Sequence, residues 1–582
     1  MKRKILAGAA VAAAVLSVLT ACGSGSGSSG ASSAFNAGVA GVVNASNATG
    51  GTLNYALSSA GDSIDPGNTY YAFSWNFSRL YASPLLSYKP APGAAGKDLV
   101  PSLATGLGTV SDNGLTWTYH IKSGMKFSDG EAITTADVKY AIERSTFAKD
   151  VLPNGPSYFK TYLVGGDTYQ GPYKDKDPNG LASIQTPDAT TIVFHLTQPF
   201  YDFNYLVADP QTAPVPADKD TGSNYQSTLV SSGPYMLKPG SFSPSSGYTL
   251  VKNPDWKQSD NPYDKQLVNQ INVSFNVNAD QIDSRLISGQ VDVDMAGTGV
   301  QTAARNKILS NPADKKDSDA APSGFLWYYP IDTQVIPNVD CRKAIEYAAN
   351  KTLFQNAYGG QAAGGSIAST VLPQSVIGYQ AFDDYEATTQ PGGDIAKAKQ
   401  ELAACGKPNG FSFNIAARSD RPKEVASAQA LQQALSQVGI KTDILQYPAS
   451  TYTNTELGSP SFMTQNNIGM GTYGWAADWP EGFGFLYSIA DGAAIQPAGN
   501  ANISMVNDPQ INQLLTTAGS TADTTTRNGI YAQIDKLMMG QADVLPELYA
   551  TSLLYRPSNL SNVYVTQAFG MYDYTQLGLS SS

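Results

Sequence analysis

The sequence predicts an α/β fold that is divided into several domains. Residues 411–447 have the pattern of a strand, a helix and a second strand, and residues 114–144 have that of a strand, two turns and a helix. The chain has 582 residues, and roughly 150 residues per domain would give three or four units. A hydrophobic content of 42% fits a globular protein.

Residues 114–144 combine a half-buried strand with a capped helix. The strand is predicted from the alternation of polar residues with the apolar residues Leu115, Trp117, Tyr119 and Ile121. A tight turn follows at Asp129-Gly130. Thr134 or Thr135 can then cap a helix, and Asp137 suits the positive end of its first turn.

Residues 411–447 predict a parallel pair of strands joined by a helix. Phe413 and Ile415 lie in the first strand, Pro422 opens the helix and Gly439 ends it. One helical face is apolar, and it consists of Val425, Ala428, Leu431, Leu435 and Val438. Ligands of such sheets bind beyond the carboxyl ends of the strands, so Arg418 is expected at the ligand edge.

The block from Gly114 to Arg144 closely resembles a motif of the extracellular solute-binding proteins of family 5. Further resemblances follow nearly the whole chain after residue 50, among them the segments 79–86, 99–104, 232–235, 288–293 and 341–348. The resemblance implies two α/β lobes of the type II periplasmic-binding-protein fold, a hinge between the lobes, and an extra third domain. Lobe I is expected over 51–80, 226–320 and 546–582, the extra domain over 81–225, and lobe II over 321–545.

The N-terminus has the pattern of a lipoprotein export signal. Lys2, Arg3 and Lys4 precede an apolar stretch, and Leu19-Thr20-Ala21-Cys22 resembles a lipobox. This implies a signal peptide over 1–21, lipidation of Cys22 and a Gly/Ser-rich tether over 22–50. The protein is therefore expected to be held by its lipid anchor on the extracellular face of a cell membrane, or in the periplasm of a Gram-negative cell.

The two remaining cysteines, Cys341 and Cys405, form an even pair in an exported chain, which favours a disulfide. Two buried free thiols are the alternative.

Residues 474–480 resemble the family segment that holds the ligand. The Asp at the position of Asp478 pairs with the α-ammonium group in peptide-binding members, and Trp475 and Trp479 flank it. Arg418 matches a position that binds the peptide carboxylate in dipeptide-binding members. Arg421 is its rival, and an ion pair between Arg418 and Asp420 is the structural alternative.

The segment from Asn68 to Trp75 lies where family members line the cleft from lobe I. Extended ligand backbone can form hydrogen bonds there. Tyr70, Tyr71 and Trp75 are the candidate ligand-stacking residues, although packing in the core is the alternative for each of them.

The implied function is the capture of di- to oligopeptides for an ABC importer, with a permease and ATPase subunits as partners. A monomer is expected. Oligosaccharide or metal-chelate binding is the alternative within the family, and a secreted hydrolase is the alternative outside it. No catalytic motif, metal cluster or cofactor motif is found, so the chain is not expected to be an enzyme. A net charge of −11 argues against a nucleic-acid partner.

Overall fold

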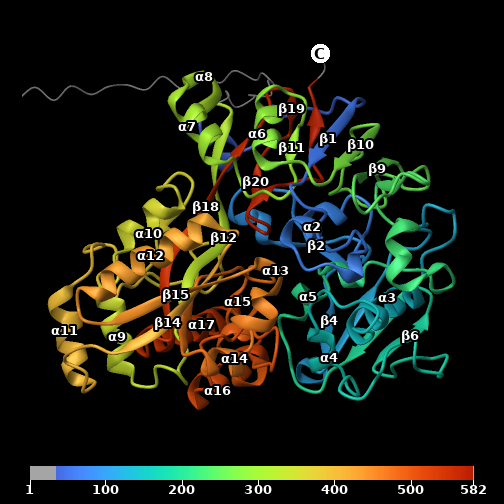
Figure 1. Ribbon diagram of the computed structural model, residues 1–582. Helices are drawn as coiled ribbons and strands as arrows, with labels where there is room; N and C mark the ends of the chain where they lie inside the picture. The colour runs from blue at the N-terminus through green and yellow to red at the C-terminus, as the bar shows by residue number, and fades with distance from the viewer. Residues whose placement is uncertain (1–33, 581–582) are drawn as a thin grey trace, which may run out of the picture. The chain divides into compact units, whose positions relative to one another are not determined.

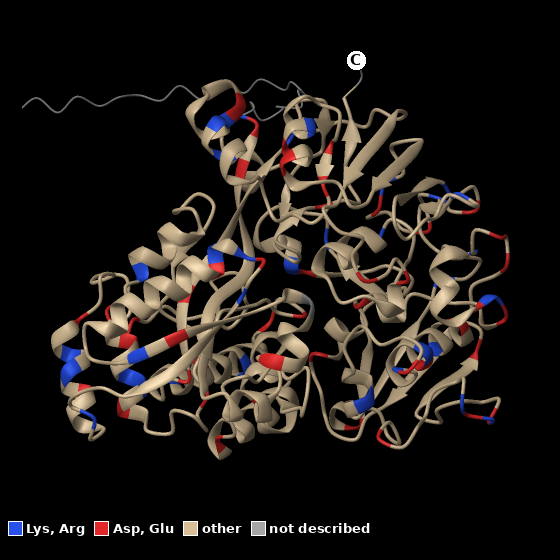
Figure 2. Cartoon of the chain, viewed as in Figure 1, with Lys and Arg blue, Asp and Glu red and all other residues tan. Residues whose placement is uncertain are grey.

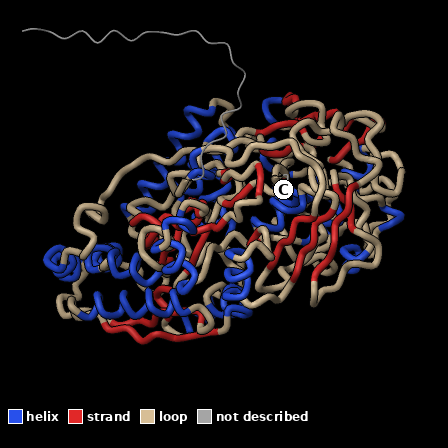
Figure 3. Tube along the Cα trace, turned by 90° about the horizontal axis from the view of Figure 1, so that it is seen from above, coloured by secondary structure: helices blue, strands red, loops and turns tan. Residues whose placement is uncertain are grey.

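The computed structural model describes residues 34–580, and helices and strands are distributed along this part of the chain (Figures 1 and 3). The predicted signal peptide and Cys22 lie outside the described residues. Among residues 34–580, no helix has both the length and the apolar character that crossing a membrane requires. Acidic and basic residues are interspersed in the view of Figure 2.

A five-stranded mixed sheet joins the beginning of the described chain to residues more than 180 positions away. Its order is β11 (Val293–Asp294), β1 (Thr52–Ala56), β10 (Gln270–Ser274), β9 (Gly247–Lys252) and β8 (Tyr235–Leu237). Strand β1 is parallel to both of its neighbours, and β9 is antiparallel to both β10 and β8. Segments that are distant in the sequence therefore share one sheet.

The predicted strand and capped helix of residues 114–144 are confirmed. Strand β5 (Thr116–His120) lies between β4 (Thr109–Ser111) and β7 (Thr191–His195), and β6 (Ile184–Asp188) completes this antiparallel sheet. Helix α3 (Thr135–Phe147) follows, and the Asp137 carboxylate accepts a hydrogen bond of 2.7 Å from the backbone N–H of Thr134. Thr134 is thus the N-cap residue and Asp137 lies in the first turn, as the sequence predicts, and the hydrogen bond between them is an additional feature of the helix start.

The predicted strand-helix-strand unit is also confirmed. Strand β14 (Ser412–Arg418) and strand β15 (Lys441–Tyr447) are parallel, and helix α12 (Pro422–Ser436) connects them. Strand β16 (Ile468–Gly471) is parallel to β14 on its other side. The carboxyl ends of these three strands consequently lie at one edge of the sheet, where Arg418 ends β14.

Two long strands, β12 (Ser318–Pro330) and β18 (Val544–Tyr555), pair antiparallel over nearly their whole length (Figure 1). Strand β13 (Gly365–Ile367) extends this sheet beside β18, and β17 (Tyr473–Trp475) extends it beside β12. The backbone of β17 approaches the Trp327 ring so closely that a Cβ atom on Gly474 would lie 2.3 Å from it. A glycine at this position therefore allows β17 to pack on β12.

The remaining helices of eight or more described residues belong mostly to the second half of the chain. They are α6 (Ala279–Ile287), α7 (Thr302–Ser310), α9 (Val339–Ala348), α10 (Lys351–Tyr358), α11 (Ile395–Ala404), α15 (Gly482–Ala490), α16 (Pro509–Ser520) and α17 (Thr524–Gly540).

The expectation of a tether that reaches residue 50 is wrong for its described part, residues 34–50. Helix α1 (Ala37–Ala40) lies here, and Val43 is 1% exposed within the main core. The backbones of Val43 and Val563 exchange two hydrogen bonds of 2.8 and 3.0 Å. The small and polar residues around Val43 give no indication of its contact with Val563, which is more than 500 residues away in the sequence.

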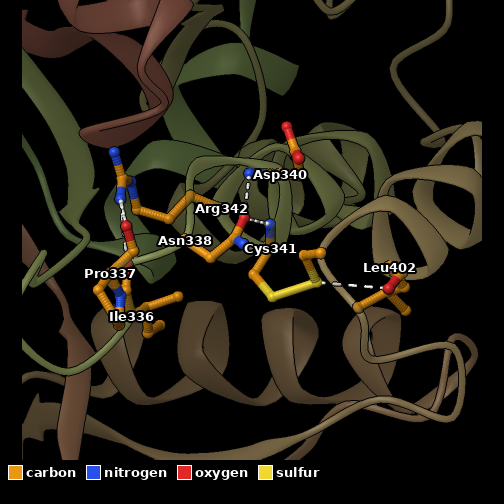
Figure 4. The surroundings of a disulfide bond; sticks show 8 residues. Ile336, Pro337, Asn338, Asp340, Cys341, Arg342 and Leu402 are labelled. Carbon is orange, nitrogen blue, oxygen red and sulfur yellow. Dashed lines mark hydrogen bonds between the residues drawn. A yellow bond between two sulfur atoms is a disulfide. The ribbon is translucent and has the colours of Figure 1, made fainter.

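The predicted disulfide between Cys341 and Cys405 is confirmed, and the alternative of two free thiols is wrong (Figure 4). Cys341 lies in the first turn of α9 and Cys405 follows α11, with 5.4 Å between their Cα atoms. Asn338 caps α9 by accepting hydrogen bonds from the N–H groups of Asp340 and Cys341. The bridge therefore fastens the start of one helix to the end of another.

Candidate functional site

A cavity of about 1080 Å³ is lined by segments from distant parts of the chain. Its lining includes Tyr70, Tyr71, Trp75, Tyr88, Tyr158, Lys160, Arg418, Arg421, Tyr473, Trp475, Asp478, Tyr487 and Phe569. Six of the seven ligand-binding residues predicted from the sequence are among them; Trp479 is not. The wall combines many aromatic rings with few charged groups, as ligand pockets commonly do.

Asp478 follows strand β17, and its carboxylate is held by two tyrosine hydroxyls. Tyr70 donates a hydrogen bond of 2.8 Å to Oδ1, and Tyr158 donates a short hydrogen bond to Oδ2. Enclosure away from bulk water raises the pKa of Asp478 to about 6, although both hydroxyls act to lower it. Within residues 34–580, no Lys, Arg or His forms an ion pair with this carboxylate.

The sequence does not predict several residues of the cavity lining, among them Tyr88, Lys160, Tyr473, Tyr487 and Phe569. The unpredicted residue that contacts Asp478 is Tyr158. It begins the short helix α4 (Tyr158–Tyr162) and is 6% exposed. Its ring packs edge-on against Trp479 with 4.9 Å between the ring centroids. The surrounding sequence carries no motif that distinguishes this tyrosine from the other 32, so only its place in the fold identifies it.

Trp475 lines the cavity, as the sequence predicts. Its indole N–H donates a hydrogen bond of 2.9 Å to the backbone oxygen of Phe485, and its ring is nearly parallel to that of Tyr473. The hydrogen bond fixes the orientation of the ring, which leaves a half-buried aromatic surface at the cavity.

Trp479 departs from the prediction of a ligand contact. It is 1% exposed, and its indole N–H donates a hydrogen bond of 3.1 Å to Asp202. Its ring lies parallel to that of Phe483, at a centroid distance of 6.2 Å. Because its polar and apolar groups are both occupied in the core, Trp479 supports Tyr158 from behind and does not line the cavity.

The three aromatic residues of the segment 70–75 differ in exposure. Tyr70 and Tyr71 are 42% and 48% exposed, which makes them available to a ligand. Trp75 is 8% exposed, and its indole N–H donates to the backbone oxygen of Thr69 at 3.0 Å. Trp75 therefore contributes one edge of its ring to the cavity wall and is otherwise packed in the core.

Arg418 lines the cavity, but its guanidinium group already has a carboxylate partner. That partner is Glu424 in the first turn of α12, with an Nε–Oε2 distance of 2.8 Å and a second contact of 2.5 Å. Arg418 therefore forms an ion pair, as the structural alternative expected, but the partner is Glu424 and not Asp420. Arg421 also lines the cavity, and its side chain forms no hydrogen bond or ion pair with any residue in the described part of the chain.

In the part of the chain that the structure describes, no cluster of His, Cys, Asp and Glu residues has the arrangement of a metal site. The cavity lining presents one carboxylate, that of Asp478, together with the cationic side chains of Lys160, Arg418 and Arg421.

The family model described as bacterial extracellular solute-binding proteins, family 5 Middle, matches residues 98–496. The chain belongs to this family. The match extends over more than half of the chain and includes most of the cavity lining.

Solved structures show that this family 5 protein has the two-lobed periplasmic-binding-protein fold. It is similar to the "Clavulanic acid biosynthesis oligopeptide binding protein 2", with a TM-score of 0.91, 36% identity, and coverage of 94% of this chain and 99% of that one. The structure of DppA from Helicobacter pylori in complex with the peptide STSA has a TM-score of 0.71 and 21% identity, with 92% and 99% coverage.

Two curated relatives of this family 5 protein bind different ligands. The glutathione-binding protein GsiB of Salmonella paratyphi A is 24% identical over 471 residues, which are 78% of this chain and 82% of the relative. The heme-binding protein A of Haemophilus influenzae is 24% identical over 498 residues, which are 82% and 83% of the two chains. Membership of the family therefore leaves the ligand to be argued from the cavity.

Proposed function

We propose that this protein is the peptide-binding component of an ABC importer and that it holds the free amino end of its ligand at Asp478. The observation that carries the proposal is a cavity carboxylate with two hydroxyl donors and no cationic partner within residues 34–580. A peptide α-ammonium group would supply the missing positive charge, and a charge-assisted hydrogen bond is strong in such a sheltered site.

The other end of a peptide carries a carboxylate, and Arg421 is the group suited to it. Its guanidinium is uncommitted in the described chain, whereas that of Arg418 is held by Glu424. A planar guanidinium matches a carboxylate through two parallel hydrogen bonds. We therefore assign the carboxylate end of the ligand to the neighbourhood of Arg421 in place of Arg418.

The size of the cavity favours an oligopeptide over a dipeptide. Its volume of about 1080 Å³ exceeds the usual range of roughly 300–1,000 Å³ for sites that bind drug-sized molecules. The structure with 36% identity is that of an oligopeptide-binding protein, which agrees with this assignment. An oligosaccharide that stacks on the tyrosine-rich wall is the alternative that ligand identification must exclude.

The remaining features of the proposal come from the sequence. Lipidation of Cys22 would hold the protein on the outer face of the cell membrane, where it would deliver ligand to a permease driven by ATPase subunits. Closure of the two lobes on a hinge would enclose the peptide. The ligand is bound and not chemically changed, so the protein would not act as an enzyme.

Acidification should weaken the binding of peptides with a free amino group. Asp478 must be ionised to pair with an ammonium group, and its pKa of about 6 means that protons compete below that pH. From pH 7.5 to pH 5, affinity should fall by roughly tenfold, since one pH unit below a pKa corresponds to about 1.4 kcal/mol. The α-ammonium group of the ligand, whose ordinary pKa is about 7.7–8.0, stays mostly protonated over this range.

Isothermal titration calorimetry at a series of pH values measures this effect. The Asp478→Asn variant and an N-acetylated peptide serve as controls, and both should show little dependence on pH. An equal pH dependence for the two peptides would contradict the assignment to Asp478.

Replacing each of the two cavity arginines should have a different effect: one replacement should weaken ligand binding, and the other should lower the stability of the fold. Arg421→Ala should weaken peptide binding by about tenfold, which corresponds to one charge-assisted hydrogen bond, and should leave thermal unfolding unchanged. Arg418→Ala should lower stability by about 3 kcal/mol, because Glu424 is only 4% exposed and would lose its cation.

Calorimetry with one peptide and thermal unfolding of each variant provide the two measurements. Lys423→Ala is a matched control, since Lys423 is an exposed neighbour that does not line the cavity. Unchanged affinity in Arg421→Ala would remove this residue from the ligand site.

A further inference from the structure

A second, much smaller cavity lies behind the aromatic wall of the ligand cavity. Its volume of about 10 Å³ gives room for roughly one water molecule. Trp75, Tyr88 and Phe569 line both cavities, so these three rings form the partition between them. Asp209 is the acidic residue on the far side of this partition.

The carboxylate of Asp209 has no structural partner in the described chain. Asp209 is 2% exposed, and its Oδ2 atom is enclosed without a hydrogen bond. The residue precedes the short 3₁₀ helix η4 (Pro210–Thr212), but its side chain does not cap that helix. Burial of a polar group without a hydrogen bond costs about 1–3 kcal/mol in proteins, and a charged group costs more.

The one cationic residue in the lining of the small cavity is committed elsewhere. The guanidinium of Arg79 donates a hydrogen bond of 2.8 Å to Asp573 and lies over the ring of Phe569 at 4.7 Å. Burial, and secondly the charge of Asp478, raise the pKa of Asp209 well above its usual value. Asp478 thus lines the large cavity and Asp209 the small one behind it, and neither carboxyl group forms an ion pair with a cation among the described residues.

We propose that Asp209 is a second anchor for the ligand and binds a cationic side chain, the guanidinium or ammonium group of a residue near the amino end of the peptide. This proposal rests on the proposed function, in which Asp478 holds the α-ammonium group. A peptide with two positive charges at this end would satisfy both carboxyl groups at once.

Tyr88 is the ring that must move to admit such a side chain. It is 7% exposed, and it contacts Phe569 edge-on at a centroid distance of 5.5 Å. Its hydroxyl group forms no hydrogen bond with any described residue, so no polar contact opposes a rotation of the ring. Rotation of Tyr88 would join the small cavity to the large one and bring Asp209 within reach of the ligand.

Calorimetry at pH 7.5 with tetrapeptides that differ only in their first or second residue tests the proposal. Lysine, arginine and norleucine are compared because norleucine has nearly the length of lysine but lacks its charge. The protein should bind the lysine or arginine peptide at least tenfold more tightly than the norleucine peptide. Asp209→Asn should abolish this preference while retaining the affinity for the norleucine peptide.

Asp98→Asn is the control, because Asp98 is a surface residue whose side chain is 62% exposed. Asp209→Asn should also unfold at the same or a higher temperature, since it removes an unpartnered buried carboxyl group; Asp209→Ser replaces it if the first variant does not fold. Binding of all three peptides without a preference for charge, as expected if Asp209 only holds a water molecule, would contradict the second anchor alone. Failure of every peptide to bind would contradict the proposed function itself.

Discussion

Asp478→Asn should weaken the binding of a peptide with a free amino group by at least about 30-fold. Removing one partner of a buried charge pair at an interface costs roughly 2–5 kcal/mol, and the lower limit already corresponds to this loss. An N-acetylated peptide of the same sequence has no ammonium group, so its weaker affinity should change only slightly. Calorimetry with the two peptides measures the difference.

The tyrosine hydroxyls provide matched controls for this variant. Tyr70→Phe and Tyr158→Phe each remove one hydrogen bond to the Asp478 carboxylate and keep the ring. Each should weaken binding by less than the loss of the carboxylate itself. Equal losses for the free and the acetylated peptide in Asp478→Asn would show that the carboxylate supports the cavity without pairing with the amine.

Loss of the disulfide should produce the largest effect on stability. Cys341 and Cys405 are 64 residues apart in the sequence, and closing a loop of that length in the unfolded chain contributes about 4 kcal/mol in the entropy model. Cys341→Ser, Cys405→Ser and the double variant should therefore unfold at lower urea concentrations by similar amounts. Urea unfolding followed by tryptophan fluorescence measures this shift.

Reduction of the unmodified protein provides the control for the disulfide variants. With a thiol reductant it should approach the stability of the double variant, while the double variant itself should not respond. Unchanged stability in all three variants would contradict a stabilising role for the bridge.

Local sequence patterns predicted several parts of this fold correctly. Trp117 and Tyr119 of the alternating residues lie in β5, and the segment with Pro422 at its helix start forms a parallel strand-helix-strand unit. These patterns depend on neighbours within about four positions, so they can be recognised from the sequence alone. The disulfide followed from an even number of remaining cysteines in an exported chain.

Side-chain partners from distant segments were beyond such patterns. Trp479 is buried, and the acceptor of its indole N–H is Asp202, 277 positions earlier. Tyr158 and Asp478 are 320 positions apart in the sequence, and no local pattern of residues predicts their hydrogen bond. Val43 joins the core through a partner near the C-terminus, so a stretch with the composition of a tether is structured.

Arg418 shows the limit at short range. Asp420 and Glu424 are both close enough to Arg418 in the sequence to pair with it. Which of them does so depends on where α12 begins, and it begins at Pro422. The helix places Glu424 beside the guanidinium of Arg418. This pairing leaves Arg421 as the uncommitted arginine of the cavity among the described residues.

Identification of the ligand that the protein carries from its own cell shows directly whether the cavity holds peptides. The protein is purified without refolding, its bound ligand is released by denaturation, and the released material is analysed by mass spectrometry. We expect oligopeptides with a free amino group, enriched in lysine or arginine near that end if Asp209 is the second anchor. Release of oligosaccharides, haem or metal chelates in their place would contradict the assignment of this cavity to peptides.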